Sequence, residues 1–149
     1  MNPNYAALEN FLRAHSTLSL ATRGPDGQPQ AASLFFAADE SLRLYWVSGD
    51  SSRHSRNLGR DPRAAVTVHA HTWNWGEIVG IQMEGAVGIV PPGPAWQAAW
   101  ELYRAKFAFV DEFQAEISRS NFYVFTPRWA RMVNNSLGFG HKDEFVFSG

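Results

Sequence analysis

Short segments in which apolar and polar residues alternate recur along most of this chain, and turn residues separate them. Alternation with a period of two is typical of strands that bury one face of a sheet. Gly24-Pro-Asp-Gly27 is a turn of the kind that joins the two strands of a hairpin. The predicted strands span residues 17–22, 30–36, 42–47, 64–71, 77–90, 122–126 and 131–135, with a possible edge strand at 144–147. This pattern favours an antiparallel, strand-dominated fold.

Glycines and helical segments complete the predicted fold. The long predicted strand 77–90 contains Gly80, Gly85 and Gly88, and glycines inside a strand mark the bulges and bends that a barrel needs. Helices are predicted over residues 4–14, from near Ser52 to Asp61-Pro62, and over 96–107. We therefore predict a mainly β fold with peripheral helices, built as a small closed antiparallel barrel.

Composition excludes several kinds of function. The 149 residues are most simply one domain, 1–149, and a net charge of -1 without runs of like charge argues against a nucleic-acid or membrane surface. Without cysteine the chain has no disulfide, thiolate metal site or thiol nucleophile, which fits a reducing cytoplasm. No segment approaches the ~20 apolar residues of a membrane span, and the N-terminus lacks signal-peptide features. We expect a soluble, cytoplasmic protein.

The segment 46–58 has the composition of a phosphate socket. An apolar strand runs through Gly49 into hydroxyl and cationic side chains at a predicted helix start. Backbone N–H groups at a helix N-terminus carry partial positive charge, serines add hydroxyl donors, and a guanidinium matches phosphate oxygens. Ser51, Ser52 and Arg53 supply these groups. The alternative is an N-capped surface helix with solvated arginines.

This socket lies within a longer order of elements. The order is strand, Ser-Ser-Arg-His, short helix, Asn-Leu, Asp-Pro-Arg and strand, followed by a long strand containing Gln82-Met-Glu-Gly85. Over residues 8–135 it resembles the pyridoxamine 5'-phosphate oxidase-like family of FMN-binding proteins, and the tail 134–142 is similar to that of an uncharacterised bacterial branch. The resemblance implies a six- to seven-stranded antiparallel split β-barrel of FMN-binding type. It also implies a homodimer with FMN at the subunit interface.

The resemblance further implies which residues hold the cofactor. Ser52, Arg53 and His54 fall where family members present Ser, Arg and Lys to the FMN phosphate, so His54 replaces a lysine. A histidine donates hydrogen bonds but is charged only part of the time near neutral pH, so we expect weaker, pH-dependent phosphate binding. The other implied cofactor residues lie beside the ring, along the ribityl chain or in the wall over the flavin: Ala32, Ser33, Leu34, Val47, Ser48, Gln82 and Trp129.

Other positions bear on the reaction and its substrate. Ala32 and Ala37 stand where pyridoxamine phosphate oxidases carry an Arg and a substrate-binding Lys, so a phosphorylated vitamin would lose its main counter-charge. We therefore expect an FMN-dependent oxidoreductase that acts on an unknown small molecule and is not an authentic pyridoxamine phosphate oxidase. In the Gly-rich tail, Asn135, His141 and Lys142 are candidates for the substrate side. The sequence identifies no catalytic residue.

Two other classes of protein stay open on the sequence. A non-catalytic split barrel would bind haem, a deazaflavin or another ligand as a sensor, carrier or stress protein. Its candidate haem ligands are His15, His54 and His141. A cupin-like metal-dependent oxygenase is the other alternative, because two histidines share one strand face with carboxylates close behind. Its candidate ligands are His69, His71, Glu77 and Glu84, with His141 as the late histidine.

Overall fold

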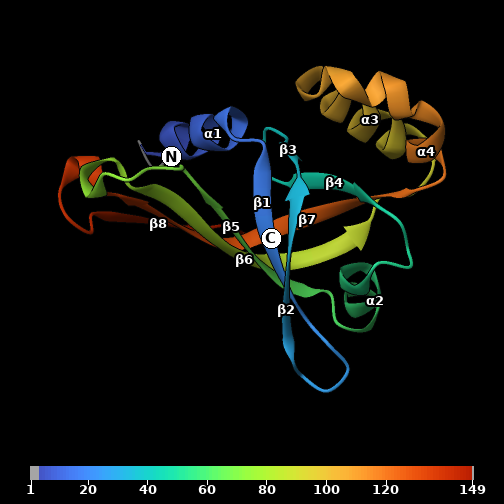
Figure 1. The fold of residues 1–149 in the computed structure, drawn as a ribbon, viewed down its shortest axis with the longest axis horizontal. Coiled ribbons are helices and arrows are strands. Elements are labelled where there is room, and N and C mark those ends of the chain that lie inside the picture. Colours follow the sequence, from blue (N-terminus) through green and yellow to red (C-terminus); the bar gives the residue numbers. More distant parts are fainter. Residues whose placement is uncertain (1–3, 149) are drawn as a thin grey trace.

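The computed structural model describes residues 4–148, which form one curled antiparallel sheet with helices at its edges (Figure 1). Its eight strands follow the order β2-β1-β5-β6-β7-β4-β3, and β8 pairs with β7. The strands are β1 (Thr17–Arg23), β2 (Pro29–Phe35), β3 (Ala37–Ala38), β4 (Leu44–Ser48), β5 (Arg63–His69), β6 (Val79–Ile89), β7 (Asn121–Asn134) and β8 (Lys142–Val146). In the part of the chain that the structure describes, no ladder joins β2 to β4, so the barrel is open between them. The predicted mainly β, antiparallel split barrel is confirmed, with eight strands in place of six to seven. The closed barrel expected from the strand and glycine pattern is wrong, because within residues 4–148 the two end strands of the sheet do not pair with each other.

The helices lie at the edges of this sheet. They are α1 (Tyr5–Ala14), α2 (Arg53–Arg60), α3 (Pro94–Lys106) and α4 (Gln114–Ser118), with 3₁₀ turns η1 (Trp75–Glu77), η2 (Ala108–Phe113) and η3 (Asn135–Leu137). The sequence predicts α1, α2 and α3 but neither η2 nor α4. Within these two elements the structure buries only Val110 and Ile117, too few positions to produce a helical period. None of the helices in the described chain is both long and apolar enough to cross a membrane.

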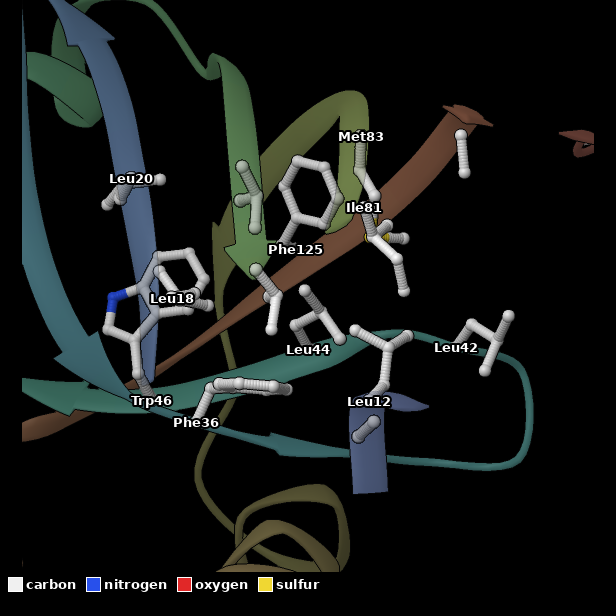
Figure 2. Close-up of a cluster of buried hydrophobic side chains, with 14 of the residues drawn as sticks. Leu12, Leu18, Leu20, Phe36, Leu42, Leu44, Trp46, Ile81, Met83 and Phe125 are labelled. Carbon is white, nitrogen blue, oxygen red and sulfur yellow. The ribbon is translucent and has the colours of Figure 1, made fainter. Parts of the chain in front are cut away.

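The core lies in two clusters, one on each side of β4. Leu44 and Trp46 point into the barrel, among inner residues of β1, β5, β6 and β7 (Figure 2). Tyr45 and Val47 belong to the second cluster, which packs beneath α3. Successive side chains of a strand point to opposite faces, so β4 contributes residues to both clusters. Ser48 is the next residue on the inner face and ends β4 beside the start of α2.

β7 runs unbroken through Pro127, where the sequence predicts two strands, 122–126 and 131–135. Pro127 lies opposite Gly85, at the point where the register between β6 and β7 shifts. Proline has no N–H to give to a ladder, and a strand tolerates it at such a bulge. Gly85 permits the close approach, because a Cβ atom there would lie 2.1 Å from the carbonyl oxygen of Thr126.

Lys106, at the C-terminal end of α3, ties that helix to α1. Its ammonium group donates hydrogen bonds to the carbonyl oxygens of His15 (2.6 Å) and Leu12 (3.3 Å), and it lies 4.1 Å from the centroid of the Phe36 ring. Burial lowers the pKa of Lys106 to about 8. Carbonyl groups at a helix C-terminus attract cations, so Lys106 caps α1 while it joins the two helices.

Candidate functional site

Three serine hydroxyls meet where β4 ends and α2 begins. Ser52 is the N-cap of α2, and its Oγ accepts a hydrogen bond from the backbone N–H of Ser55 (3.3 Å). The Ser52 Oγ also lies 2.6 Å from the Ser55 Oγ and 3.1 Å from the Ser48 Oγ. The structure thus brings together Ser48 and Ser52, which the resemblance implies as cofactor residues. Ser48, Ser52 and Ser55 are called the hydroxyl cluster below.

His54 lies against the hydroxyl cluster. Its Nε2 is 2.9 Å from the Ser48 Oγ and 3.2 Å from the Ser52 Oγ. Burial lowers the pKa of His54 below its usual value of 6.5. The imidazole is therefore mainly neutral at pH 7 and exchanges hydrogen bonds with the hydroxyls instead of adding a fixed positive charge.

α2 presents a cation at the end where a helix prefers an anion. Arg53 is the first residue of the helix and is exposed, and the first turn contains no acidic residue. The free N–H groups of that turn add partial positive charge to the charge of the guanidinium. An unfavourable charge at a helix end costs roughly 0.3–1 kcal/mol, and a bound anion would reverse that effect. The N-terminus of α2 therefore combines hydroxyl, N–H and guanidinium donors suited to an anion.

Trp46 places a buried donor on the same face of β4 as the hydroxyl cluster. Its side chain is fully buried, and among the described residues its indole Nε1–H has no hydrogen-bond partner. Trp46 lies two residues before Ser48, so both side chains leave the same face of the strand. Figure 2 shows the indole nitrogen on the side of the ring away from the centre of the cluster. An unmade hydrogen bond of this kind costs about 1–3 kcal/mol, which a ligand or a water molecule can recover.

The implied ring-side residues lie on β2, the edge strand beside the opening of the barrel. Alternate backbone N–H and C=O groups of β2 point away from β1. Ala32 and Leu34 face inward, and Leu34 packs against the core, whereas Ser33 faces outward. Val47 faces the second core cluster, on the opposite side of β4 from Ser48. Ring contacts from β2 would therefore be made largely by backbone groups.

Gln82 and Trp129 lie on the outer face of the sheet, apart from the hydroxyl cluster. One row of that face crosses the strands through Ser33, Ser19, Thr67, Gln82, Arg131 and Glu144. Three strand spacings, roughly 14 Å, separate Ser33 from Gln82. Trp129 lies on the next row, where the guanidinium carbon of Arg131 is 5.3 Å from its ring centroid. Within one chain the structure does not bring these two residues to the N-terminus of α2.

The candidate substrate-side residues lie at the far end of β7. The Asn135 side-chain amide donates to the carbonyl oxygen of Trp75 (2.9 Å), and its Oδ1 accepts from the N–H of Gly140 (2.9 Å). Asn135 is buried, and these bonds close the Gly-rich turn against η1. His141 and Lys142 are exposed where β8 begins. Asn135 therefore shapes the turn that carries the other two.

The histidines considered as metal or haem ligands do not form one site. His69 and His71 are exposed, and no group of three or more His, Cys, Asp or Glu side chains in residues 4–148 is placed to hold a metal ion. The cupin-like alternative therefore has no donor set in this part of the chain. His15 is the C-cap residue of α1, where its Nδ1 lies 2.7 Å from the carbonyl oxygen of Phe11 and its ring stacks on the Phe11 ring.

The sequence does not predict two of the polar groups of the site. Ser55 joins the hydroxyl cluster from the position three residues after the N-cap, a spacing that places a side chain back over the cap. The indole N–H of Trp46 is the other. The alternation of Leu44, Trp46 and Ser48 along one strand face is the signal that links it to the site.

Comparison with known proteins gives a family and a fold. The sequence model described as Pyridoxamine 5'-phosphate oxidase matches residues 6–134. A UPF0306 protein of Yersinia pestis bv. Antiqua (strain Angola) is 32% identical over 143 residues, which cover 95% of this chain and 92% of the relative. The structure of a heme binding protein from Mycobacterium smegmatis is similar with a TM-score of 0.77 at 23% identity, over 95% of this chain and 57% of that chain. An FAD-binding protein from Mesorhizobium loti has a TM-score of 0.66 at 18% identity, over 85% of this chain and 89% of that chain.

Proposed function

Because this chain belongs to the pyridoxamine 5'-phosphate oxidase family, we propose that it is a flavoprotein that binds FMN with the phosphate at the N-terminus of α2. The observation that carries this proposal is the donor set gathered there. The hydroxyl cluster, the exposed Arg53 and the free N–H groups of the first turn all belong to the N-terminus of α2. These are the donors that bind phosphate groups in proteins.

The opening of the barrel supports a place for the flavin ring. The edge strand β2 carries unpaired backbone groups that suit the polar edge of an isoalloxazine ring. The unpartnered indole N–H of Trp46 lies on the face of β4 that ends in the hydroxyl cluster. FMN, when bound, supplies the hydride and electron transfer, so the protein needs no catalytic triad or metal.

The residues of this chain would then bind the phosphate and orient the flavin ring. Ser52, Ser55 and Arg53 would hold the phosphate, and the backbone of β2 would orient the ring. His54 gives one N–H donor when neutral and two when protonated, so binding of a phosphate dianion favours proton uptake at His54. Phosphate binding would therefore depend on pH near neutrality. A lysine at this position would not cause this dependence.

The substrate we propose is a small molecule other than pyridoxamine phosphate. Ala32 and Ala37 provide no counter-charge for a second phosphate, and Ala37 is 1% exposed within the second core cluster. A substrate bound over the ring would therefore be held without a cation from these two positions. This supports an oxidoreductase of different specificity from the enzyme that gives the family its name.

We also propose a homodimer with FMN between the subunits. Gln82 and Trp129, implied as flavin contacts, lie on the outer face of the sheet and apart from the hydroxyl cluster. In the two-fold dimer that we propose, the outer face of one copy lies against the open barrel edge of the other. Each flavin would then contact α2 and β2 of one chain, and Gln82 and Trp129 of the partner.

A non-catalytic carrier of haem or a deazaflavin is the second candidate. The fold is similar to that of a heme binding protein. His54 is the partly buried histidine beside the opening of the barrel, so it is the residue that a haem iron would contact. In this alternative the hydroxyl cluster would only cap α2 and orient the imidazole.

The visible absorption spectrum of the purified protein separates these candidates. We expect two flavin bands, and after denaturation we expect the released chromophore to be FMN by its retention and mass. A Soret band would support the haem candidate. A colourless protein that also leaves the fluorescence of added FMN unquenched would overturn the flavin proposal.

A further inference from the structure

A cavity of about 910 Å³ opens beside the bulge between β6 and β7. Its volume lies within the range of small-molecule sites, roughly 300–1,000 Å³. Distant parts of the chain build its walls: Tyr5 of α1, the turn before β4, the start of β5, the bulge itself and residues 146–148 at the end of β8 and just after it. Strand pairing joins the start of β5, the bulge and the end of β8, and the curl of the sheet brings α1 and the turn before β4 to them.

The charged side chains that line this cavity are mainly arginines. Arg43, Arg63 and Arg128 contribute guanidinium groups, and Glu40 is the acidic residue of the lining. Each arginine comes from a different part of the fold: Arg43 precedes β4, Arg63 begins β5, and Arg128 lies in β7. Guanidinium groups that converge from separate elements are typical of sites for phosphate or carboxylate.

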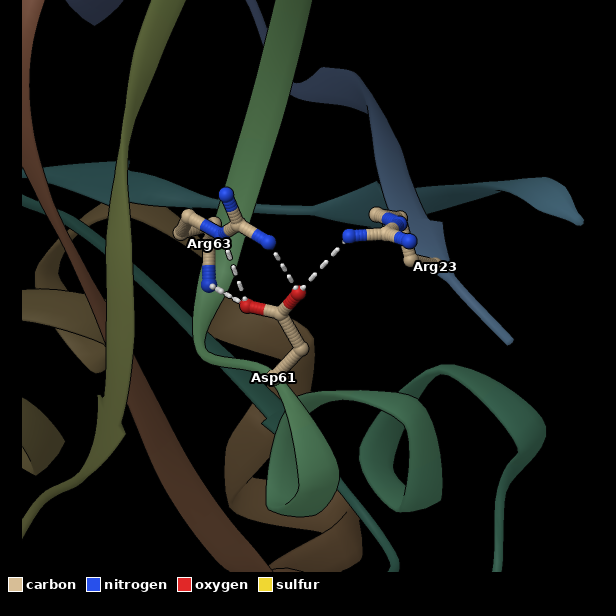
Figure 3. A network of polar contacts seen from close by, with 3 residues as sticks. All are labelled: Arg23, Asp61 and Arg63. Carbon is tan, nitrogen blue, oxygen red and sulfur yellow. Dashed lines mark hydrogen bonds and ion pairs between the residues drawn. The ribbon is translucent and has the colours of Figure 1, made fainter. Parts of the chain in front are cut away.

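Two carboxylates outside the cavity hold two of these arginines in place. Asp61 accepts hydrogen bonds from the Nε (3.0 Å) and Nη2 (2.8 Å) of Arg63, and Arg23 lies 3.5 Å from the same carboxylate (Figure 3). Hydrogen bonds from Arg63 lower the pKa of Asp61 to about 2, so this carboxylate stays ionised. Asp39 accepts from the Nε of Arg43 (2.8 Å). The two-point contact fixes the guanidinium plane of Arg63, a single bond holds Arg43, and both arginines keep other N–H groups for a ligand.

Arg128 is the arginine without a fixed partner. Glu84 pairs with Trp129 and Gly85 with Pro127, so Arg128 is the extra residue of the bulge. In residues 4–148 its guanidinium makes no hydrogen bond or ion pair, and the side chain is exposed at the cavity. The bulge thus removes Arg128 from the regular ladder. It places at the cavity a positive charge that no carboxylate of the described chain pairs with.

We propose that this cavity binds a small molecule through a phosphate or carboxylate group, with Arg128 as its principal charge contact. The site is separate from the N-terminus of α2, because Arg63 follows the C-terminal end of that helix and eight residues of helix span about 12 Å. It does not depend on flavin binding. Asp39 and Asp61 already neutralise Arg43 and Arg63, so those two arginines orient the anion and Arg128 supplies the attraction.

The test is a titration of the ligand-free chain, followed by NMR at each arginine Nε–H. Inorganic phosphate is one probe and succinate is the other. We expect saturable shifts at Arg63 and Arg128 with at least one probe, and we expect Arg128→Gln to weaken that affinity several-fold. Arg119→Gln is the matched control, since Arg119 is an exposed arginine at the end of α4, and it should bind as the unaltered chain does.

The two probes identify the chemistry. A response to phosphate alone assigns a phosphoryl ligand, and a response to succinate alone assigns a carboxylate. Absence of saturable shifts at both Arg63 and Arg128, or equal affinity in Arg128→Gln, would overturn the proposal. Phosphate shifts at the backbone of 52–55 report the α2 site separately, so failure of the flavin proposal is distinguishable from failure of this one.

Discussion

At the scale of single residues, His54 sets the chemistry of the phosphate end. A lysine at this position would be a permanent cation next to two serine hydroxyls, whereas a partly buried imidazole is neutral in the ligand-free protein at pH 7. Arg53 is then the permanently charged side chain at the first position of α2. Phosphate affinity in this chain should therefore depend on Arg53 for charge and on His54 for hydrogen bonding.

The pH dependence of folding checks the environment of His54. Because burial lowers the pKa of His54 in the folded state, the unfolded chain binds this proton more readily. The free energy of unfolding should therefore fall as the pH drops below 6.5, the usual pKa of the side chain. Urea unfolding of the ligand-free protein at about pH 7.5 and about pH 5.5 measures the effect.

His54→Gln should reduce this loss of stability, while His71→Gln, at an exposed position, should leave it unchanged. Equal pH dependence in the unaltered chain and in His54→Gln would contradict the assignment.

At the scale of secondary-structure elements, the sequence predicts the strands, but it does not predict the register in which neighbouring strands pair. Alternation predicts the strands, and the Ser52–His54 segment is found because its donors are adjacent in the sequence. The continuity of β7 through Pro127 depends on a bulge opposite Gly85, which no local pattern reveals. The arginine-lined cavity is missed for the same reason, since the bulge and the curl of the sheet bring Arg43, Arg63 and Arg128 together.

Gly85→Ala tests the role of this bulge. A Cβ atom at Gly85 would lie 2.1 Å from the Thr126 carbonyl oxygen, which is backbone and cannot move aside without breaking the ladder. We expect a loss of roughly 2–4 kcal/mol in the free energy of unfolding. Gly88→Ala, on the same strand with nothing within 4 Å, is the matched control and should change stability little. Similar unfolding curves for the two variants would show that the bulge tolerates a side chain.

At the scale of the whole molecule, one row across the outer face of the sheet carries neutral side chains on β2, β1, β5 and β6 and ends in the Arg131–Glu144 ion pair on β7 and β8. Ser19, Ser33, Thr67 and Gln82 are the neutral residues of this row, and exposed apolar side chains such as Phe35 and Val146 lie on the neighbouring rows. The neutral part of this row costs little to desolvate, which suits the proposed two-fold dimer. The same face carries Gln82 and Trp129, so dimer formation and completion of the flavin site would be one event.

Thr67→Lys tests this dimer. A two-fold interface repeats every substitution on both copies, and charges added to a desolvated surface oppose association. We expect the unaltered protein to be dimeric by light scattering, and Thr67→Lys to shift toward monomer with weaker FMN binding. Ala105→Lys, on the exposed side of α3, should change neither property. A monomeric unaltered protein that still binds FMN tightly would contradict the shared site.

The central claim is that the N-terminus of α2 holds the phosphate of FMN. Fluorescence titration with FMN and with riboflavin, which lacks the phosphate, isolates that contribution in the same protein. We expect FMN to bind at least about tenfold more tightly, the scale of one charge-assisted contact of about 1.4 kcal/mol. Arg53→Gln should reduce this ratio while it leaves riboflavin affinity unchanged. Equal affinity for the two flavins, or an equal loss for both in Arg53→Gln, would contradict the account.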